Sequence, residues 1–335
     1  MNTSTPAPAP LAAATLDAAV AALRAGKPVG MPTETVYGLA ADARNPEAVA
    51  RIFALKGRPL DHPVIVHLPA GAALHDYASE VPAFAEALAK TFWPGPLTLI
   101  LRRQPWVSDA ITGGQDTVGL RMPAHPVAQQ LLVAFGGGLA APSANRFGHI
   151  SPTTATHVRD EFGSDLPIVL DGGPCAIGIE STIVDCSGAR PRLLRPGMLS
   201  VDAIERVVGQ LDGDTQLAPR ASGMLEKHYA PRAPLRLVSR AELERAELER
   251  GDREHGELAR TPHARVIALG SMPAGCSGVV LPDDPDRYAR GLYEALRALD
   301  HGGDAPILLE SPPRTPSWLA IHDRLGRAAA GSGEH

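Results

Sequence analysis

The stretch Met31–Arg58, MPTETVYGLAADARNPEAVARIFALKGR, carries the signals that decide how the chain folds. It opens with a hydroxyl-rich turn that contains Thr33 and Thr35, and it closes with the corner Lys56-Gly57-Arg58. A short helix is predicted between these two ends. Two cations and several small hydrogen-bond donors so close together predict an anion site, such as a site for a nucleotide.

The predicted helix has recognisable boundaries. Asn45 is a favourable N-cap, Pro46 fits the first helical position, and Gly57 can end the helix in the left-handed conformation. The apolar stripe of the helix consists of Val49, Ile52 and Phe53. Lys56 lies seven residues after Val49 and therefore on the same face. We predict that Lys56 points inward, at the end of the core stripe.

Length and composition predict a folded protein with two domains. The chain has 335 residues, of which 44% are hydrophobic and 21% are charged, and a domain comprises roughly 150 residues. No apolar run reaches the roughly 18 residues that a membrane-spanning helix needs. Residues 1–10, MNTSTPAPAP, lack the basic and apolar regions of a signal peptide. We therefore predict a disordered tail over residues 1–10, a cytoplasmic location and no membrane association.

Charge and metal-binding residues exclude several classes of protein. The net charge of -5 and the pI near 6.2 argue against a protein that coats nucleic acid, but they are compatible with a local basic cleft. Cys175, Cys186 and Cys276 form no C-x-x-C pair, which argues against disulfides and structural zinc, and we predict that they are buried apolar residues. The histidines form no H-x-x-x-H pair, so no metal site is predicted.

Strands and helices alternate through residues 11–210 with short Pro/Gly turns between them, which predicts an α/β or α+β domain. The predicted strands are 29–31, 63–68, 97–101, 117–122, 138–141, 168–171, 181–185 and 192–195. The predicted helices are 11–25, 46–56, 81–91, 126–135 and 201–210. In the strand 63–68, Ile65 and His67 share one face, and Val64 and Val66 share the other.

Residues 211–234 have no clear periodicity and are predicted as an interdomain linker. Residues 235–330 are predicted as a smaller Rossmann-like α/β domain. Its predicted strands are 235–238, 266–269, 279–281 and 307–310, with a helix at 286–299. The tandem AELER repeat at 241–250 predicts a solvated helix, and dinucleotide binding is not indicated because no G-x-G-x-x-G motif is present.

Candidate site residues lie at or near predicted element ends, where α/β folds build ligand sites. They are Thr33, Lys56, Arg58, His67, Arg121, Ser143, Ser181 and Arg195. Each of them alone has a structural explanation, such as a helix dipole partner or a turn hydroxyl. Together, the four cations of this set could offset the charge of a triphosphate and of an α-carboxylate.

Ordered sequence blocks give the chain a resemblance to a known family. They are PTETVYGL, Lys56-Gly57-Arg58, WPGPLTLIL, TVGLRMPAHP, Ser143-Ala144-Asn145, SPT, ESTI and LLRPG, followed by KHYAP and the C-terminal AIHDRLGRAA. The chain resembles the threonylcarbamoyl-adenylate synthases from about residue 11 to 330. The last two blocks resemble the two-domain Sua5 form rather than the single-domain YrdC form. The resemblance implies an α/β fold with an N-terminal YrdC-like twisted mixed sheet flanked by helices, and a smaller C-terminal Rossmann-like domain.

The resemblance also implies a reaction in which L-threonine, bicarbonate and ATP give L-threonylcarbamoyl-adenylate and pyrophosphate. The product would serve a tRNA threonylcarbamoyl-transferase complex, which modifies adenosine beside the anticodon. The positions implied for L-threonine are Thr33, His67, Arg121, Ala141 and Ser181. The positions implied for ATP or the adenylate are Lys56, Arg58, His62, Thr117, Ser143, Asn145, Ser151, Arg195 and Tyr229.

Physical chemistry suits these implied roles. Arg121 can clamp a carboxylate through two hydrogen bonds, and Lys56 with Arg58 can stabilise charge on the phosphoryl oxygens as the catalytic pair, together with Mg²⁺ carried by ATP. No protein nucleophile is required. His62 stands where the family leads us to expect Asn, and imidazole replaces only one hydrogen-bonding function of the amide. The linker is predicted to act as a lid with Tyr229 over the site, because the carbamate is labile in water.

Two alternatives remain open. One is the carbamoyl-adenylating domain of hydrogenase maturation factors, but no acylphosphatase or zinc-finger region is visible in the sequence. The other is a double-stranded RNA-binding or ribosome-associated protein, which the acidic net charge and the 4% aromatic content disfavour. A weak contact with tRNA or double-stranded RNA is also compatible with the enzyme.

Overall fold

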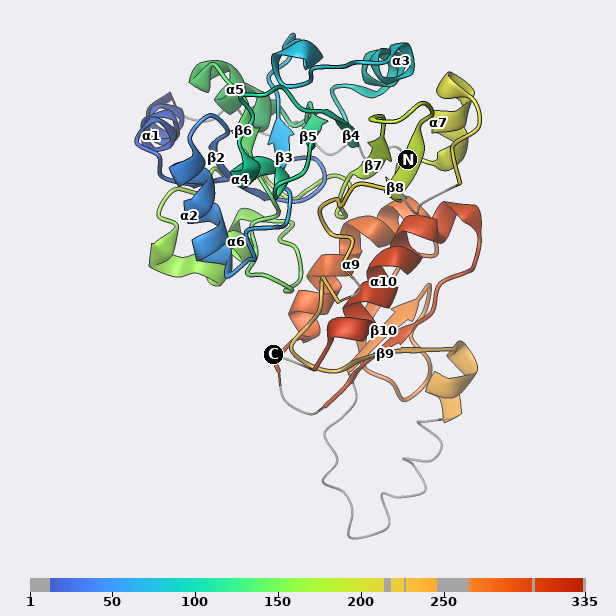
Figure 1. Ribbon diagram of the computed structural model, residues 1–335. Helices are drawn as coiled ribbons and strands as arrows, with labels where there is room; N and C mark the ends of the chain where they lie inside the picture. The colour runs from blue at the N-terminus through green and yellow to red at the C-terminus, as the bar shows by residue number, and fades with distance from the viewer. Residues whose placement is uncertain (1–12, 214–217, 226, 246–264, 303–304, 334–335) are drawn as a thin grey trace. The chain divides into compact units, whose positions relative to one another are not determined.

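The computed structural model describes residues 13–213, 218–225, 227–245, 265–302 and 305–333, and they form an α/β fold with two compact units (Figure 1). Unit 1 comprises Met1–Phe147, Ser151–Ala176 and Glu180–Met224. Unit 2 comprises Gly148–Ile150, Ile177–Ile179 and Leu225–His335. The segment 211–234, predicted as a linker, is therefore divided between the units after Met224. The predicted tail at residues 1–10 lies outside the described residues.

Unit 1 is built on a mixed sheet of eight strands in the order β1-β2-β6-β3-β5-β4-β7-β8. The strands are β1 Val29–Met31, β2 Gly38–Asp42, β3 Ile65–His67, β4 Leu97–Arg102, β5 Thr117–Arg121, β6 Leu139–Ala140, β7 Thr182–Asp185 and β8 Arg192–Arg195. The pairs β3–β5 and β4–β7 are parallel, whereas the other neighbours are antiparallel. This arrangement confirms the mixed sheet that was predicted.

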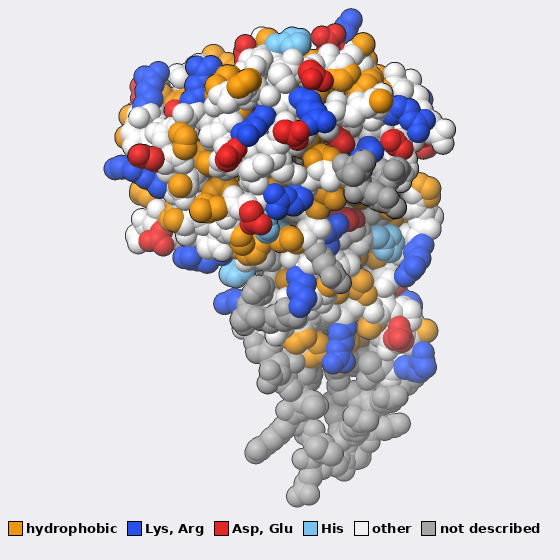
Figure 2. All heavy atoms as spheres, viewed as in Figure 1, with side chains coloured by type: hydrophobic (Ala, Val, Ile, Leu, Met, Phe, Trp, Pro, Cys, Tyr) orange, Lys and Arg blue, Asp and Glu red, His pale blue; other side chains and the backbone are white. Residues whose placement is uncertain are grey.

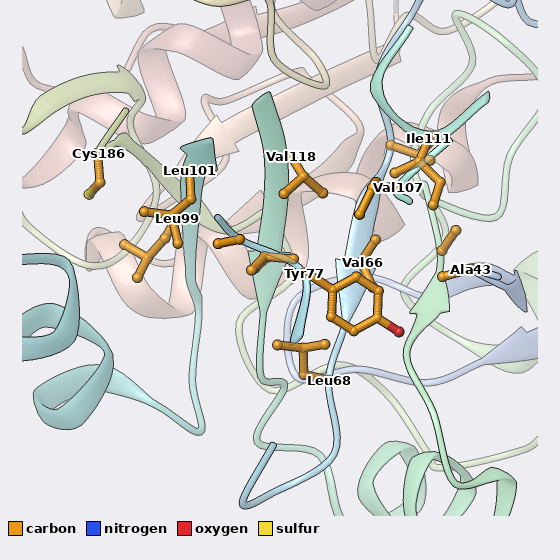
Figure 3. Packing of buried hydrophobic residues seen from close by; sticks show 14 of the residues in the cluster. Ala43, Val66, Leu68, Tyr77, Leu99, Leu101, Val107, Ile111, Val118 and Cys186 are labelled. Atoms are coloured by element: carbon orange, nitrogen blue, oxygen red, sulfur yellow. The ribbon is translucent and has the colours of Figure 1, made fainter. Parts of the chain in front are cut away.

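Helices cover the sheet of unit 1 and fix its core. They are α1 Ala13–Arg24, α2 Pro46–Lys56, α3 Ala83–Phe92, α4 Asp109–Thr112, α5 Pro126–Phe135, α6 Ala155–Phe162 and α7 Val201–Val208, with short 3₁₀ turns at Leu74–Asp76 and Gly163–Asp165. Val66, Leu99 and Val118 belong to one buried hydrophobic cluster of unit 1 (Figure 3). Ala40 packs in the cluster with α1 and α5, whereas Leu39 packs in the cluster with α2 and α6. Successive residues of β2 thus join different parts of the core, as the alternation of strand side chains requires.

Two sequence predictions in unit 1 were wrong. The strand β2, with the sequence GLAAD, was missed because it has no β-branched or aromatic residue to signal a strand. The predicted strand 168–171 forms only a single parallel bridge, between Gly30 and Val169. Pairing stops there because the chain then enters the turn at Gly172, whose amide donates to the Tyr37 hydroxyl at 3.1 Å.

Unit 2 contains a sheet of four parallel strands in the order β11-β10-β12-β9. The strands are β9 Leu235–Val238, β10 Arg265–Leu269, β11 Gly278–Leu281 and β12 Ile307–Glu310, and the helices are α9 Pro285–Leu299 and α10 Leu319–Gly331, preceded by a 3₁₀ turn at Pro316–Trp318. The predicted Rossmann-like arrangement with a strand-helix-strand unit is confirmed. Only the first half of the AELER repeat lies among the described residues.

Two further predictions concern single features. Cys175 and Cys186 are buried as predicted, whereas Cys276 is only half-buried. Among the described residues, no helix is long and apolar enough to cross a membrane.

Candidate active site

The helix α2 holds Lys56 at the end of its buried stripe, as the sequence predicted. The Asn45 side chain accepts from the amides of Glu47 and Ala48 at 3.1 Å, and Gly57 ends the helix at φ 62°. Lys56 is only 3% exposed, and its Nζ donates to the Ser143 carbonyl at 2.6 Å and to the Asn145 carbonyl. Burial lowers the pKa of Lys56 well below its usual range, and Arg58 lowers it further.

The loop that receives Lys56 is held in place by backbone hydrogen bonds. The Ala144 amide donates to the Tyr37 carbonyl at 2.8 Å, and the Phe147 amide donates to the Lys56 carbonyl at 2.8 Å. The Asn145 side chain turns back on this loop, because its Nδ2 donates to the Arg146 carbonyl at 2.7 Å. The Lys-Gly-Arg corner and the Ser143-Ala144-Asn145 motif therefore form one structural unit.

Arg58 and Arg195 meet at a short segment, 218–224, which we call the strap. Arg58 Nη2 donates to the Pro63 carbonyl at 2.8 Å and lies 3.5 Å from Ser222 Oγ. Arg195 Nη1 donates to the Ser222 carbonyl at 2.7 Å, while its Nε and Nη2 donate to the Ser181 carbonyl. Two predicted nucleotide residues are thus brought together by a third residue that the prediction did not include.

Arg121 lies at the end of β5 in a dense set of contacts. Its Nη2 forms an ion pair with Glu34 Oε1 at 2.7 Å, and its Nη1 donates to Thr35 Oγ1 at 2.8 Å. Its Nε donates to the Gly95 carbonyl at 3.3 Å. Thr33 Oγ1 donates to the Val36 carbonyl at 2.6 Å and lies 2.9 Å from Thr35 Oγ1. The turn 33–36 therefore fixes both its own hydroxyls and the guanidinium of Arg121.

His67 lies beside Arg121 on neighbouring strands of the sheet, whereas Ala141 lies at the other end of β3, beside Ile65. His67 pairs with Arg121 in the parallel β3–β5 register, and the Ala141 amide donates to the Ile65 carbonyl at 2.9 Å. Burial, followed by the charge of Arg121, lowers the pKa of His67 to about 3. His67 is therefore a neutral imidazole at neutral pH, suited to hydrogen bonding rather than to charge.

A chain of contacts connects the implied threonine and nucleotide sides. Gly95 accepts from Arg121, and the next residue, Pro96, accepts from the Thr182 amide at 3.0 Å. Ser181 precedes Thr182 and accepts from Arg195. The structure therefore brings most of the predicted residues into one network across the ends of β4, β5, β7 and β8.

The remaining predicted residues have separate environments. Ser151 Oγ donates to Glu180 Oε1 at 2.6 Å, and Thr117 is buried at the start of β5. His62 is partly exposed, and burial followed by Arg58 lowers its pKa. Tyr229 belongs to unit 2, where it is buried at φ 62° and stacks on Tyr293 at 5.9 Å between ring centroids. Its role as a lid residue stays a prediction.

Sequence reasoning missed residues that hold the predicted ones. They are Glu34, Thr35, Thr98, Glu180 and Ser222, which contact Arg121, Ser181, Ser151, Arg58 or Arg195. Glu34 and Glu180 could have been found, because both are acidic residues inside motifs that were singled out. Ser222 could not, because the strap has no periodicity.

A cavity of about 550 Å³ lies elsewhere in unit 1, on the exposed side of α2. Its lining includes Lys27, Arg51, Leu55, Arg146 and Asp165. None of the predicted site residues lines this cavity, and its charged groups are mostly exposed. The network of buried cations, not this cavity, is therefore the candidate active site.

Comparison with known proteins identifies the family of this chain. The family model Sua5/YciO/YrdC, described as "Telomere recombination", matches residues 21–197. The chain belongs to the Sua5/YciO/YrdC family. A second model, "Threonylcarbamoyl-AMP synthase, C-terminal domain", matches residues 199–330 and identifies the two-domain Sua5 form. This second match begins before α7, so α7 and the strap fall within it although both lie in unit 1.

Relatives in this family match nearly the whole chain. A threonylcarbamoyl-AMP synthase of Pyrococcus abyssi is 42% identical, with 92% of each chain covered. One of Bacillus subtilis is 41% identical, covering 93% of this chain and 92% of that protein. The crystal structure of P. abyssi Sua5 complexed with L-threonine matches with a TM-score of 0.85 at 38% identity, covering 94% of each chain.

Proposed function

We propose that this protein is an L-threonylcarbamoyladenylate synthase, a nucleotidyltransferase that makes threonylcarbamoyl-AMP and pyrophosphate from L-threonine, bicarbonate and ATP. The observation that carries the proposal is the match to two named synthases over more than nine-tenths of each chain. The buried cations of unit 1 add physical support, since the reaction needs both a carboxylate partner and phosphate partners.

L-Threonine is assigned to the side of the network around Arg121. Its carboxylate would receive hydrogen bonds from Arg121, and the hydroxyls of Thr33 and Ser181 would contact its polar groups, together with neutral His67 and the backbone at Ala141. The P. abyssi relative was crystallised with L-threonine, which supports an amino-acid site in this fold.

The nucleotide is assigned to the side around Lys56. Lys56, Arg58 and Arg195 supply positive charge, and the other side chains named for ATP complete the set: His62, Thr117, Ser143, Asn145, Ser151 and Tyr229. Lys56 is the most constrained of these groups because two carbonyl oxygens hold its ammonium. A preorganised cation of this kind stabilises charge that develops on phosphoryl oxygens.

The chemistry has two bond-forming steps. The amine nitrogen of threonine bonds to the carbon of bicarbonate with loss of water and gives a carbamate. A carbamate oxygen then bonds to the α-phosphorus of ATP, the bond to the bridging oxygen breaks, and pyrophosphate leaves with that electron pair. Lys56 and Arg58 act as catalytic residues on the phosphoryl oxygens, and no protein nucleophile takes part.

Mg²⁺ is proposed to enter with ATP. The described residues contain no cluster of three or more His, Cys, Asp or Glu side chains suited to a metal, and Glu34 and Glu180 are engaged by Arg121 and Ser151. This donor set fits an ion held mainly by phosphate oxygens and water, as Mg²⁺ commonly is. When bound, it would neutralise phosphate charge beside Lys56 and Arg58.

We further propose that the product is passed, in the cytoplasm, to a tRNA threonylcarbamoyl-transferase complex. The alternative of an RNA-binding protein gains no support from the charge distribution. On the face of unit 1 drawn in Figure 2, Lys and Arg side chains are interspersed with Asp and Glu rather than gathered in a basic stripe.

Pyrophosphate release tests the proposed function. Purified protein is supplied with ATP and Mg²⁺, and L-threonine and bicarbonate are each omitted in turn, with mass spectrometry of the adenylate as a second readout. Release that depends on both co-substrates is expected. Release that is independent of either one, or salt-sensitive RNA binding without turnover, would refute the proposal.

A further inference from the structure

Glu34 and Arg121 form a buried ion pair that the assigned roles do not explain. The pair spans 2.7 Å, and Glu34 is only 8% exposed. Glu34 lies between Thr33 and Thr35 in the turn that fixes the Arg121 guanidinium. The carboxylate is therefore placed in the amino-acid side of the network by the same turn.

The Glu34 carboxylate has unused hydrogen-bonding capacity. Oε1 forms an ion pair with Arg121, but both Oε1 and Oε2 are buried and have no hydrogen-bond partner among the residues that the structure describes. Leaving a buried charged oxygen without a donor costs roughly 1–3 kcal/mol or more, so such an atom needs an explanation. A ligand that brings a donor would supply it.

The neighbours of Glu34 do not supply that donor. Glu34 exerts electrostatic effects on His125 and Cys175. The His125 ring nitrogens are already used by the Val127 amide and the Gly172 carbonyl. Burial raises the pKa of the Cys175 thiol, and among the described residues this thiol makes no hydrogen bond to Glu34. Arg121 is thus the only cation ion-paired with Glu34 within the described ranges.

Arg121 also retains capacity for a ligand. A guanidinium has five N–H donors, and two are engaged in hydrogen bonds, by Thr35 and by the Gly95 carbonyl. Nη2 lies 2.7 Å from Glu34 Oε1 in the ion pair but has no hydrogen-bond partner among the described residues. The pair therefore offers the N–H donors of Nη2 beside an anionic acceptor, and its net charge is zero.

We propose that Glu34 is a specificity-determining residue that receives the α-ammonium group of the amino acid while Arg121 receives its carboxylate. The ion pair then matches a zwitterion, and it selects α-amino acids over hydroxy acids that carry only the carboxylate. This inference rests on the proposed function and deepens it. After carboxylation, the nitrogen retains one hydrogen, so the same contact to Glu34 persists in the carbamate.

Two ligands separate this role from a structural one. L-Threonine has both charged groups, whereas 3-hydroxybutyrate of the same C3 configuration keeps the carboxylate, the hydroxyl and the methyl but lacks the amine. Glu34→Gln keeps the size of the side chain and an oxygen for Arg121 but removes the negative charge. We expect the variant to weaken L-threonine binding by about tenfold or more, with inhibition by 3-hydroxybutyrate unchanged or stronger.

The outcomes are distinguishable. An equal loss for both ligands would mean that Glu34 only holds Arg121, and no loss for L-threonine would mean that Glu34 does not contact the amine; either result overturns the inference.

Exposed Glu80→Gln is the matched control, and thermal unfolding verifies folding. If Glu34→Gln does not fold, Glu34→Asp keeps the charge, and it should keep the wild-type preference for L-threonine over 3-hydroxybutyrate. Turnover of the wild-type protein is measured first. Absence of that turnover would refute the proposed function itself, which is a different result from failure of the inference about Glu34.

Discussion

Lys56 and Arg121 are both buried cations, yet the protein treats their charges differently. Arg121 is neutralised by Glu34 at 2.7 Å, whereas Lys56 donates to the neutral carbonyls of Ser143 and Asn145. Within the described residues, no carboxylate forms an ion pair with Lys56, and Glu161 only partly offsets the lowering of its pKa. One cation is compensated inside the fold, and the other is not.

We propose that this difference reflects the ligand that each side of the candidate site receives. An uncompensated ammonium in a buried place is unfavourable alone, and a polyanionic ligand such as a triphosphate would relieve that cost. The ion pair of Arg121 with Glu34 has no net charge and therefore does not favour an anion over a neutral ligand. The remaining donors of Arg121 are held in place beside the Glu34 carboxylate, which suits a zwitterion.

Removal of the uncompensated cation should have the largest effect. Lys56→Ala is expected to lower turnover by about 10²-fold or more, the scale for loss of one preorganised donor. The protein should remain folded, because the substitution also removes a buried charge. Pyrophosphate release and thermal unfolding measure the two effects.

Lys27→Ala is the matched control for this variant, since Lys27 is exposed and outside the site network. It should leave turnover unchanged. Near wild-type pyrophosphate release by Lys56→Ala would contradict the assignment of Lys56 to the phosphates. It would also remove the basis for contrasting the two cations.

Substrate choice tests the amino-acid side with a smaller effect. Serine lacks one methyl of threonine, and a pocket can gain only about 1–3 kcal/mol from such a group. Both amino acids carry the same zwitterion, so Glu34 and Arg121 should not distinguish them. Competition between serine and threonine for turnover measures the preference. A much larger ratio of threonine to serine turnover would show that the pocket recognises threonine by more than the volume of its methyl group.

The sequence predicted the buried position of Lys56 but not the contact between Glu34 and Arg121, for a physical reason. Lys56 lies on a helix, so the position of Val49 and the cap at Asn45 determine where its side chain points. The turn around Glu34 has no period, and its ion pair with Arg121 joins residues far apart in the sequence. Such long-range pairing is not visible in local patterns.

The same reasoning explains what the sequence could show of the fold. Most helices and strands were predicted from periodicity and caps. The strand β2 was missed because its sequence, GLAAD, lacks the β-branched and aromatic residues that are typical of strands. The strap was predicted only as part of a linker. Its contacts to Arg58 and Arg195 depend on tertiary packing, in which Ala218, Ala221 and Met224 lie against the cluster of Ile100, Ile183 and Leu194.

His67 gives a pH-dependent test of the amino-acid side. Its folded-state pKa of about 3 lies below the usual 6.5, so the unfolded chain binds the proton first as pH falls. Its neutral form therefore favours folding above pH 6.5, and this contribution declines as pH falls toward 3. At pH 5 the expected loss of unfolding free energy is about 2 kcal/mol.

Urea unfolding at pH 7.5 and pH 5 measures this loss, with His67→Asn as the comparison. The variant should lose about 2 kcal/mol less than the wild type between the two pH values, because Asn does not titrate. His75→Asn, on the short turn at Leu74–Asp76, is the control and should behave as the wild type. An equal pH dependence in wild type and His67→Asn would show that His67 is accessible to protons in the folded state.

The smallest predicted effect concerns the strap, which touches only the phosphate side. Ser222 Oγ donates to the Pro63 carbonyl at 2.8 Å, so Ser222→Ala removes this hydrogen bond together with the longer 3.5 Å contact from Arg58, while the Ser222 carbonyl still accepts from Arg195. A single bond of this kind contributes about 1 kcal/mol, and we expect KM for ATP to rise about fivefold, with KM for L-threonine unchanged. Exposed Ser79→Ala is the control. If the KM values for ATP and for L-threonine rose together, the strap would affect both sides of the site equally. The contrast between Lys56 and Arg121 would then not apply to the strap.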